Sequence, residues 1–178
     1  MPDRRPRGYS LYELLLTLAI ASVVLGLGVP SFATLAADRR ITAQLDPLFH
    51  AVHRARKASI VRRRVVTLCA SADGKQCDDS YDGSAGWSVF FNRDRDEPPR
   101  RDADEPLLVV HAGDARTAVT ANRRAFTLRS TKLRATNGTL VVCDRAGRGT
   151  SRALVVSYTG RPRVARTTSR GDAWRCAD

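Results

Sequence analysis

The stretch that decides the fold runs from Arg7 to Ala37 and has the sequence RGYSLYELLLTLAIASVVLGLGVPSFATLAA. Its 24 residues from Leu14 to Ala37 include no charged side chain. A helix of roughly 20 apolar residues spans the hydrocarbon core of a bilayer, so this stretch predicts a membrane-spanning helix. Because Arg4, Arg5 and Arg7 precede it, we expect the short N-terminal head to stay in the cytoplasm and the rest of the chain to face outward.

One acid, Glu13, stands at the start of the apolar run. A charged side chain at mid-bilayer costs roughly 2.5–3.5 kcal/mol on insertion scales and less near the interface, so an acid here indicates a function and a partner. If the chain is cut between Gly8 and Tyr9, the new α-amine lies four residues before Glu13. We expect the Glu13 of a neighbouring copy to neutralise this amine during assembly.

The segment Gly8-Tyr9-Ser10-Leu11-Tyr12-Glu13-Leu14-Leu15 resembles the prepilin signal of type IV pilins and type II secretion pseudopilins. The resemblance implies that a prepilin peptidase cuts after Gly8, that the new N-terminus at Tyr9 is methylated, and that Glu13 guides subunit docking. Tyr9 replaces the commoner Phe. Pro30 matches the helix-breaking Pro of pilins, and since proline removes a backbone donor and clashes with the preceding turn, we expect a break or weak point in the helix there.

An ordinary secretory signal peptide is the alternative interpretation of the N-terminus. Arg4, Arg5 and Arg7 would be its basic region, with cleavage near Leu35-Ala36-Ala37. Glu13 argues against this alternative, because an apolar signal core has no use for a buried acid.

The charge of the chain is strongly basic and unevenly placed. The 178 residues carry a formal net charge of +12, with a pI near 10.7, which suggests nucleic acid or an anionic surface as a partner. Residues 116–178 hold fourteen basic side chains against three acids, a net charge of +11, whereas residues 73–105 have a net charge of −5. At 43% hydrophobic residues, the chain fits one modest globular domain plus a membrane segment.

The four cysteines are Cys69, Cys77, Cys143 and Cys176. An even number behind an export signal predicts two disulfides in an oxidising compartment. Three pairings are possible, and we favour the local one, Cys69–Cys77 with Cys143–Cys176. A zinc site made of four thiolates is the alternative, but the close cysteine pairs usual for zinc are absent.

Beyond Pro30 the chain predicts one helix followed by strands. Apolar residues at steps of three and four mark a helical stripe of Ile41, Leu45, Leu48, Val52 and Ala55. Pro47 is expected to bend this helix, and Arg62–Arg64 to end it. Short β-branched or apolar runs then predict strands near residues 65–69, 87–91, 107–111, 118–120, 125–129, 139–143, 153–158 and 161–165. Asn137-Gly138 predicts a hairpin turn between residues 132–134 and 139–143.

These elements predict an α+β fold, with a long N-terminal hydrophobic helix packed on a C-terminal antiparallel β-sheet globular domain. We divide the chain into a leader peptide (1–8), a transmembrane and assembly helix (9–37), an amphipathic continuation of that helix (38–64) and a β-rich globular domain (65–178).

Metal binding and catalysis find little support in the residues. Asn92-Arg93-Asp94-Arg95-Asp96 places oxygens at alternate positions like the start of a calcium loop, but the central Gly is missing and Ala103 stands where the last acid would be. His50, His53 and His111 belong to no recognisable triad. We therefore expect no cofactor, no metal and no enzymatic activity.

A basic segment, Gly160-Arg161-Pro162-Arg163, follows a predicted strand near the C-terminus. Glycine permits a tight turn and proline stiffens the segment, so the two arginines are displayed with little conformational freedom. An arginine fork matches phosphate oxygens in bidentate geometry. The residues expected to extend this cationic track are Arg152, Arg166, Arg170, Lys132 and Arg134.

The whole chain resembles a minor pilin of the FimT/GspH type. The matching features are the prepilin signal, Thr67-Leu68-Cys69 with Cys77, Gly86-Trp87-Ser88-Val89-Phe90, Cys143-Asp144, and Gly160-Arg161-Pro162-Arg163 before Cys176. In FimT-type members a Gly-Arg-x-Arg motif is associated with DNA binding in natural transformation, which implies that Arg161 and Arg163 contact DNA without sequence preference.

The resemblance also implies partners and a location. The partners are other major and minor pilins, the prepilin peptidase, the inner membrane before assembly, and DNA. The globular domain would be periplasmic first and then extracellular in the pilus. The alternative function is a structural minor pilin or a type II secretion pseudopilin that primes or caps a fibre and touches protein only.

Overall fold

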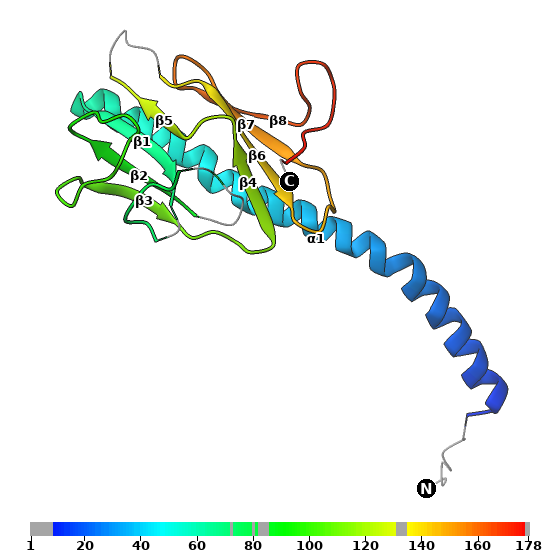
Figure 1. Ribbon diagram of the computed structural model, residues 1–178. Helices are drawn as coiled ribbons and strands as arrows, with labels where there is room; N and C mark the ends of the chain where they lie inside the picture. Colours follow the sequence, from blue (N-terminus) through cyan, green and yellow to red (C-terminus); the bar gives the residue numbers. More distant parts are fainter. Residues whose placement is uncertain (1–8, 72, 80, 82–85, 131–134, 177–178) are drawn as a thin grey trace, which may run out of the picture.

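The computed structural model describes residues 9–71, 73–79, 81, 86–130 and 135–176. One long helix is followed by eight strands in the described part (Figure 1). The elements are α1 (Leu11–Arg62), β1 (Val65–Ala70), β2 (Trp87–Asn92), β3 (Leu107–His111), β4 (Thr117–Ala121), β5 (Ala125–Leu128), β6 (Gly138–Asp144), β7 (Arg152–Val156) and β8 (Pro162–Ala165).

Both ends of α1 are capped by local interactions. The Ser10 hydroxyl accepts a hydrogen bond from the backbone N–H of Glu13 at 3.2 Å, which satisfies one of the unpaired donors of the first turn. At the other end Arg63 adopts the left-handed conformation with φ 51°, and its N–H donates to the carbonyl of Ile60. The basic residues there suit the negative end of the helix dipole.

The helix break expected at Pro30 is not present. Residues on both sides of Pro30 and of Pro47 remain helical, and α1 is continuous over 52 residues. Each proline removes only one hydrogen bond, and the turns on either side keep theirs, so a long helix accommodates the loss by curving. Figure 1 shows this curvature along the N-terminal half of α1.

The predicted antiparallel β domain consists of two sheets. Sheet A has the order β3-β2-β1-β5 and sheet B the order β4-β6-β7-β8. After β3 the chain leaves sheet A for β4, returns to it for β5, and leaves again for β6. From β3 to β6, successive strands therefore alternate between the sheets, which strand periodicity cannot reveal.

The stripe predicted on the C-terminal half of α1 forms the centre of the core. Ile41, Leu45, Leu48, Val52 and Ala55 are all buried and belong to one cluster with side chains from both sheets. The cluster includes Leu68 and Phe126 of sheet A and Leu140, Leu154 and Val156 of sheet B. Burying a Leu, Ile or Val side chain stabilises a fold by about 1.5–3 kcal/mol each, so this helix face joins the two sheets.

The N-terminal half of α1 makes no comparable contacts. Its apolar side chains between Leu11 and Leu35 are exposed. By length and composition this part of the helix is apolar enough to cross a membrane, and none of its most apolar window is buried. The helix therefore has one half suited to lipid or to other helices and one half suited to a protein core.

The hairpin predicted at Asn137-Gly138 is wrong. Neither residue has a positive φ, as a two-residue hairpin turn would need, and Gly138 is the first residue of β6. Glycine is required there for another reason. A Cβ on Gly138 would lie 2.6 Å from Oδ1 of Asn122 and 3.0 Å from Cε1 of Phe126, so the crossing between the sheets leaves no room for a side chain.

We predict that Leu48→Ala destabilises the globular domain by about 2–5 kcal/mol, because it opens a cavity where α1 meets the sheets. Ile60→Ala, on the same helix but 49% exposed, is the control and should cost less than about 1 kcal/mol. Urea unfolding of the full chain in an uncharged detergent measures both. Equal losses for the two variants would contradict this account of the core.

Candidate nucleic-acid interface

The basic segment singled out from the sequence forms a tight hairpin between β7 and β8. Val156 lies opposite Pro162, and residues 157–161 form the loop. The N–H of Gly160 donates to the carbonyl of Ser157 at 2.8 Å, and the N–H of Ser157 donates to the carbonyl of Arg161 at 3.1 Å. Gly160 has φ +70°, and a Cβ there would lie 2.7 Å from a methyl carbon of Leu128, so the turn requires glycine.

The hairpin displays Arg161 and Arg163 on one side. Residues that face each other across antiparallel strands point to the same side of a sheet, and successive residues alternate. Leu154 and Val156 are buried against the core, so Val155 and its partner Arg163 point outward. Arg161, two residues earlier, follows the same alternation, and both arginines are exposed. We call the side of sheet B that carries Val141, Cys143, Ala153, Val155 and Arg163 the outer face.

The structure places Arg152 on the opposite side, which corrects its expected membership of the cationic track. Arg152 lies two residues before the buried Leu154 on β7, so its side chain points to the same side of the sheet, toward α1. Its Nη1 donates to the hydroxyl of Thr42 on α1 at 3.0 Å. Its Nε is buried without a hydrogen-bond partner. The other two candidate residues, Lys132 and Arg134, lie outside the described residues.

The C-terminal tail beyond β8 folds back over the outer face. Arg166 is exposed and begins a loop closed by a bridge between Thr167 and Ala173. Trp174 and Cys176 then pack on a small cluster of outer-face residues, Val141, Cys143 and Ala153. This arrangement depends on a disulfide between Cys143 and Cys176.

The second disulfide joins Cys69 and Cys77 and closes the loop after β1. No cysteine is left free. These two bonds are the local pairing favoured from the sequence.

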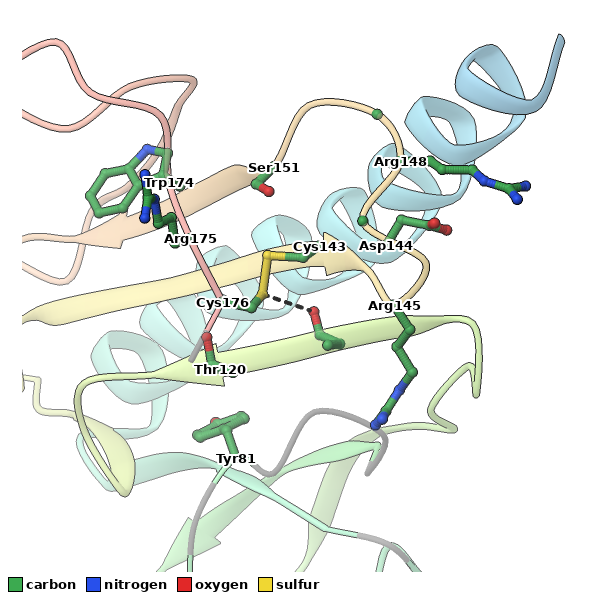
Figure 2. Close-up of a pocket in the computed structure, with 13 residues that line it drawn as sticks. Tyr81, Thr120, Cys143, Asp144, Arg145, Arg148, Ser151, Trp174, Arg175 and Cys176 are labelled. Atoms are coloured by element: carbon green, nitrogen blue, oxygen red, sulfur yellow. Dashed lines mark hydrogen bonds between the residues drawn. A yellow bond between two sulfur atoms is a disulfide. The ribbon is translucent and has the colours of Figure 1, made fainter. Parts of the chain in front are cut away.

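A cleft of about 620 Å³ opens on the outer face beside the tail. Figure 2 shows Arg145 and Arg148 on the loop that follows β6, and Arg175 on the tail. The cleft is lined by Tyr81, Ala118, Thr120, Cys143, Asp144, Arg145, Gly147, Arg148, Gly149, Ser151, Trp174, Arg175 and Cys176. The cationic track expected from the sequence did not include these three arginines, although the favoured Cys143–Cys176 pairing brings Arg175 close to the segment that begins at Arg145.

Among the described residues that line this cleft, Asp144 is the one acid, and its negative charge is already paired with Arg40. It belongs to the end of β6 that faces α1, where the Arg40 guanidinium lies 2.9 Å from its Oδ1. Burial alone would raise the pKa of Asp144, but hydrogen bonds from Arg40 and from the backbone N–H groups of Arg148 and Ala146 outweigh burial and lower it. The outer face is therefore cationic, without a competing free carboxylate in the cleft.

The loop that resembles a calcium site is held by its own acids. Asp96 accepts hydrogen bonds from the Asn92 amide at 2.9 Å and from the backbone N–H of Arg100 at 2.6 Å, and Asp94 accepts one from the N–H of Asp96. Within the described ranges, no three His, Cys, Asp or Glu side chains come together as a metal site.

The three histidines all pack against aromatic rings. His111 stacks on Trp87 and lies 3.0 Å from the Gln44 side chain, and burial lowers its pKa. His50 and His53 instead make edge contacts with Phe49 on α1.

A long helix, apolar and exposed at its start and packed on an antiparallel β domain at its end, defines a pilin-like protein. A family model described as Type II transport protein GspH matches residues 45–160, about two thirds of the chain. The chain therefore belongs to the GspH family, and the predicted membership of the GspH/FimT-type minor pilins is confirmed.

The same fold occurs in two crystal structures of the type IV minor pilin FimU from Pseudomonas aeruginosa. One is 16% identical, with a TM-score of 0.50, over 70% of this chain and 91% of that one. The other is 17% identical, with a TM-score of 0.51, over 77% and 94%. No curated protein sequence matches the chain.

We predict that Cys143→Ser/Cys176→Ser lowers the free energy of unfolding by roughly 2–4 kcal/mol and releases the tail from the outer face, since the bond closes a span of 33 residues. Limited trypsin digestion should then cut at Arg166 and Arg170 faster than in the parent. Cys69→Ser/Cys77→Ser is the control, because its loop is short and does not hold the tail. Unchanged cleavage at the two arginines would show that packing of Trp174 alone holds the tail.

Proposed function

We propose that this chain is a membrane-inserted minor pilin that is processed, extracted and built into a type IV pilus, near its tip, and that its outer face binds extracellular DNA for uptake in natural transformation. The observation that carries the DNA part is the β7–β8 hairpin, which displays two exposed arginines, Arg161 and Arg163, on the outer face, where Arg145, Arg148 and Arg175 line the cleft. The proposal assigns no catalytic residue and no cofactor.

The arginine spacing supports phosphate contacts. Two residues apart in extended chain means a separation of about 6.6 Å, close to the rise of two nucleotides along the axis of a duplex. Guanidinium groups bind phosphate oxygens in bidentate geometry and carry no base information on their own. The proposed binding is therefore independent of sequence and weakens steeply with salt, because each contact releases condensed counterions.

The N-terminal part of the proposal concerns processing and location. A prepilin peptidase cuts between Gly8, which lies outside the described residues, and Tyr9, whose amine is then methylated. Residues 9–37 cross the inner membrane, with the N-terminus cytoplasmic, and the domain of residues 65–178 is periplasmic until the subunit enters the pilus. The exposed apolar surface of the first half of α1 supports this, because it needs lipid or neighbouring helices to cover it.

The role proposed for Glu13 follows from the helix start. Cleavage would leave a positive amine on Tyr9, two residues before the first residue of α1, and a positive charge is unfavourable at a helix N-terminus. Glu13 lies exposed in the first turn. The carboxylate of one copy meeting the amine of the next removes both unfavourable charges from the apolar centre of a fibre.

A purely structural subunit is the second candidate. The family description, a type II transport protein, favours it, since a pseudopilin that primes or caps a fibre touches only protein. The apolar helix and the proposed processing are the same in both candidates, so DNA binding separates them.

We predict that Arg161→Gln/Arg163→Gln weakens binding to unrelated duplexes by roughly tenfold and lowers the slope of log affinity against log salt by about 2, because two phosphate contacts are lost. The full chain in an uncharged detergent is titrated with duplexes at several salt concentrations. Arg39→Gln/Arg116→Gln removes the same charge from exposed positions elsewhere and is the control. The DNA assignment fails if the hairpin variant and the control bind alike.

We predict that the Glu13→Ala chain is still cut before Tyr9 but stays in the membrane instead of entering fibres, since no carboxylate meets the amine of the neighbouring subunit. Intact mass measurement gives the N-terminus, and immunoblots of sheared fibres and of membranes give the distribution. Thr17→Ala, one turn further along the helix, should enter fibres normally. Normal incorporation of the Glu13→Ala chain would remove the docking role.

A further inference from the structure

A second group of arginines lies at the end of the domain farthest from the apolar half of α1. The helix ends in Arg62, followed by Arg63 and Arg64, and all three are exposed. At 1.5 Å per residue, Arg62 lies about 37 Å along the axis beyond Ala37. This end of the domain points away from any membrane that the first half of α1 crosses.

Strand register brings two more arginines to the same place. Val65, the first residue of β1, lies opposite Asn92, the last residue of β2. The residue before β1 is Arg64 and the residue after β2 is Arg93, so the two chain segments leave the sheet side by side. Arg95 lies two residues further and is also exposed.

These residues surround a hollow of about 220 Å³, lined by Arg62, Arg63, Arg64, Val65, Asn92, Arg93 and Arg95. We call the five arginines the distal pole. None of the residues described in this lining is acidic, so five like charges converge with nothing in the hollow to balance them.

Internal contacts account for part of the distal pole. The Arg62 guanidinium lies 5.1 Å from the centre of the Phe91 ring, and Arg93 Nη1 lies 3.2 Å from Asp104 Oδ2 at the surface. In the described structure, the side chains of Arg63, Arg64 and Arg95 make no ion pair or hydrogen bond.

The neighbouring acids are engaged elsewhere. Asp94 and Asp96 hold the loop through backbone and amide N–H groups, and the buried Glu105 accepts the N–H of Arg93. The negative end of the helix dipole favours cations at Arg62–Arg64 but gives no reason for Arg93 and Arg95, which come from another segment.

We propose that the distal pole is a second phosphate-binding site, and that one DNA molecule contacts it together with the β7–β8 hairpin. This inference rests on the proposed DNA-binding function. The hairpin lies at the same end of the domain, because the Cβ position of Gly160 is 2.7 Å from Leu128 and 3.1 Å from Arg56 of α1. Leu128 in turn lies opposite Val66, next to the start of β1. Hairpin and distal pole therefore flank one end of sheet A.

Distance identifies the anion as nucleic acid rather than a lipid headgroup. The distal pole lies about 37 Å beyond the end of the apolar stretch, whereas the potential of an anionic bilayer decays over roughly 8–10 Å at physiological salt. A duplex carries one phosphate charge per roughly 1.7 Å of its axis, so it can supply anions to both arginine groups at once.

The test removes charge at the two arginines whose backbone conformation also accepts asparagine. Arg63 and Arg95 have φ 51° and 62°, a left-handed conformation in which asparagine is enriched, so Arg63→Asn/Arg95→Asn should fold like the parent. The full chain in an uncharged detergent is titrated with duplex DNA over a salt series. We expect a salt slope lower by about 2 and affinity reduced several-fold, as for any two lost phosphate contacts. The control is Arg39→Gln/Arg116→Gln, and circular dichroism verifies folding.

The outcomes separate this inference from the function it rests on. If the distal-pole variant keeps the slope of the control while Arg161→Gln/Arg163→Gln loses affinity, the distal pole is not a DNA site and the proposed function stands. If the distal-pole variant loses affinity and the hairpin variant does not, the distal pole is the site and the hairpin assignment fails. If the parent chain does not bind duplexes, both fail.

Discussion

The structure depends on one helix face that packs against two sheets at once. Ile41, Leu45, Leu48 and Val52 belong to one buried cluster with side chains from both sheets, so this face of α1 joins the two sheets. The same helix continues without a break into an apolar half that the domain does not cover. The orientation of the domain relative to the apolar half is thus fixed by continuous helical hydrogen bonds rather than by a linker.

Two polar contacts hold the junction where α1 enters the domain. Arg40 pairs with the buried Asp144 at the end of β6, and the Asp38 carboxylate accepts the N–H of Thr150 at 2.7 Å. Both contacts tie α1 to sheet B at its end nearest the apolar half. At the opposite end of the domain no described acid is bound to the helix, and that is where the arginines of the distal pole and of the hairpin gather.

The sequence predicted the features that depend on local residue patterns, namely the elements and the tight turn. Periodicity located the buried helical stripe and each strand that the structure describes, and glycine followed by arginine located the β7–β8 hairpin. It could not predict which strands pair, because the pattern of buried residues is the same for one sheet and for two. Gly138 shows the consequence. The pair Asn137-Gly138 suggested a turn, but glycine is needed there because Asn122 and Phe126 leave no room for a side chain. Arg152 was predicted on the wrong side of the sheet, because closeness to the other arginines in the sequence does not place a residue on the same face. Strand alternation turns its side chain toward Thr42.

The distal pole depends on the register between Val65 and Asn92, which no sequence pattern contains.

The placement of charge is consistent with an external polyanion. Like charges on one face repel and destabilise a compact state, so a C-terminal third with a net charge of +11 opposes its own folding. The fold uses acids to hold loops and the helix junction, as at Asp96 and Asp144, rather than to neutralise the arginines of the outer face. A phosphate backbone would balance that charge only when bound, so binding and stability are linked: a ligand that binds the folded state alone stabilises it by an amount that grows with the logarithm of its concentration. Under the proposed function, this linkage makes the arginine-bearing end of the domain most stable when DNA is bound.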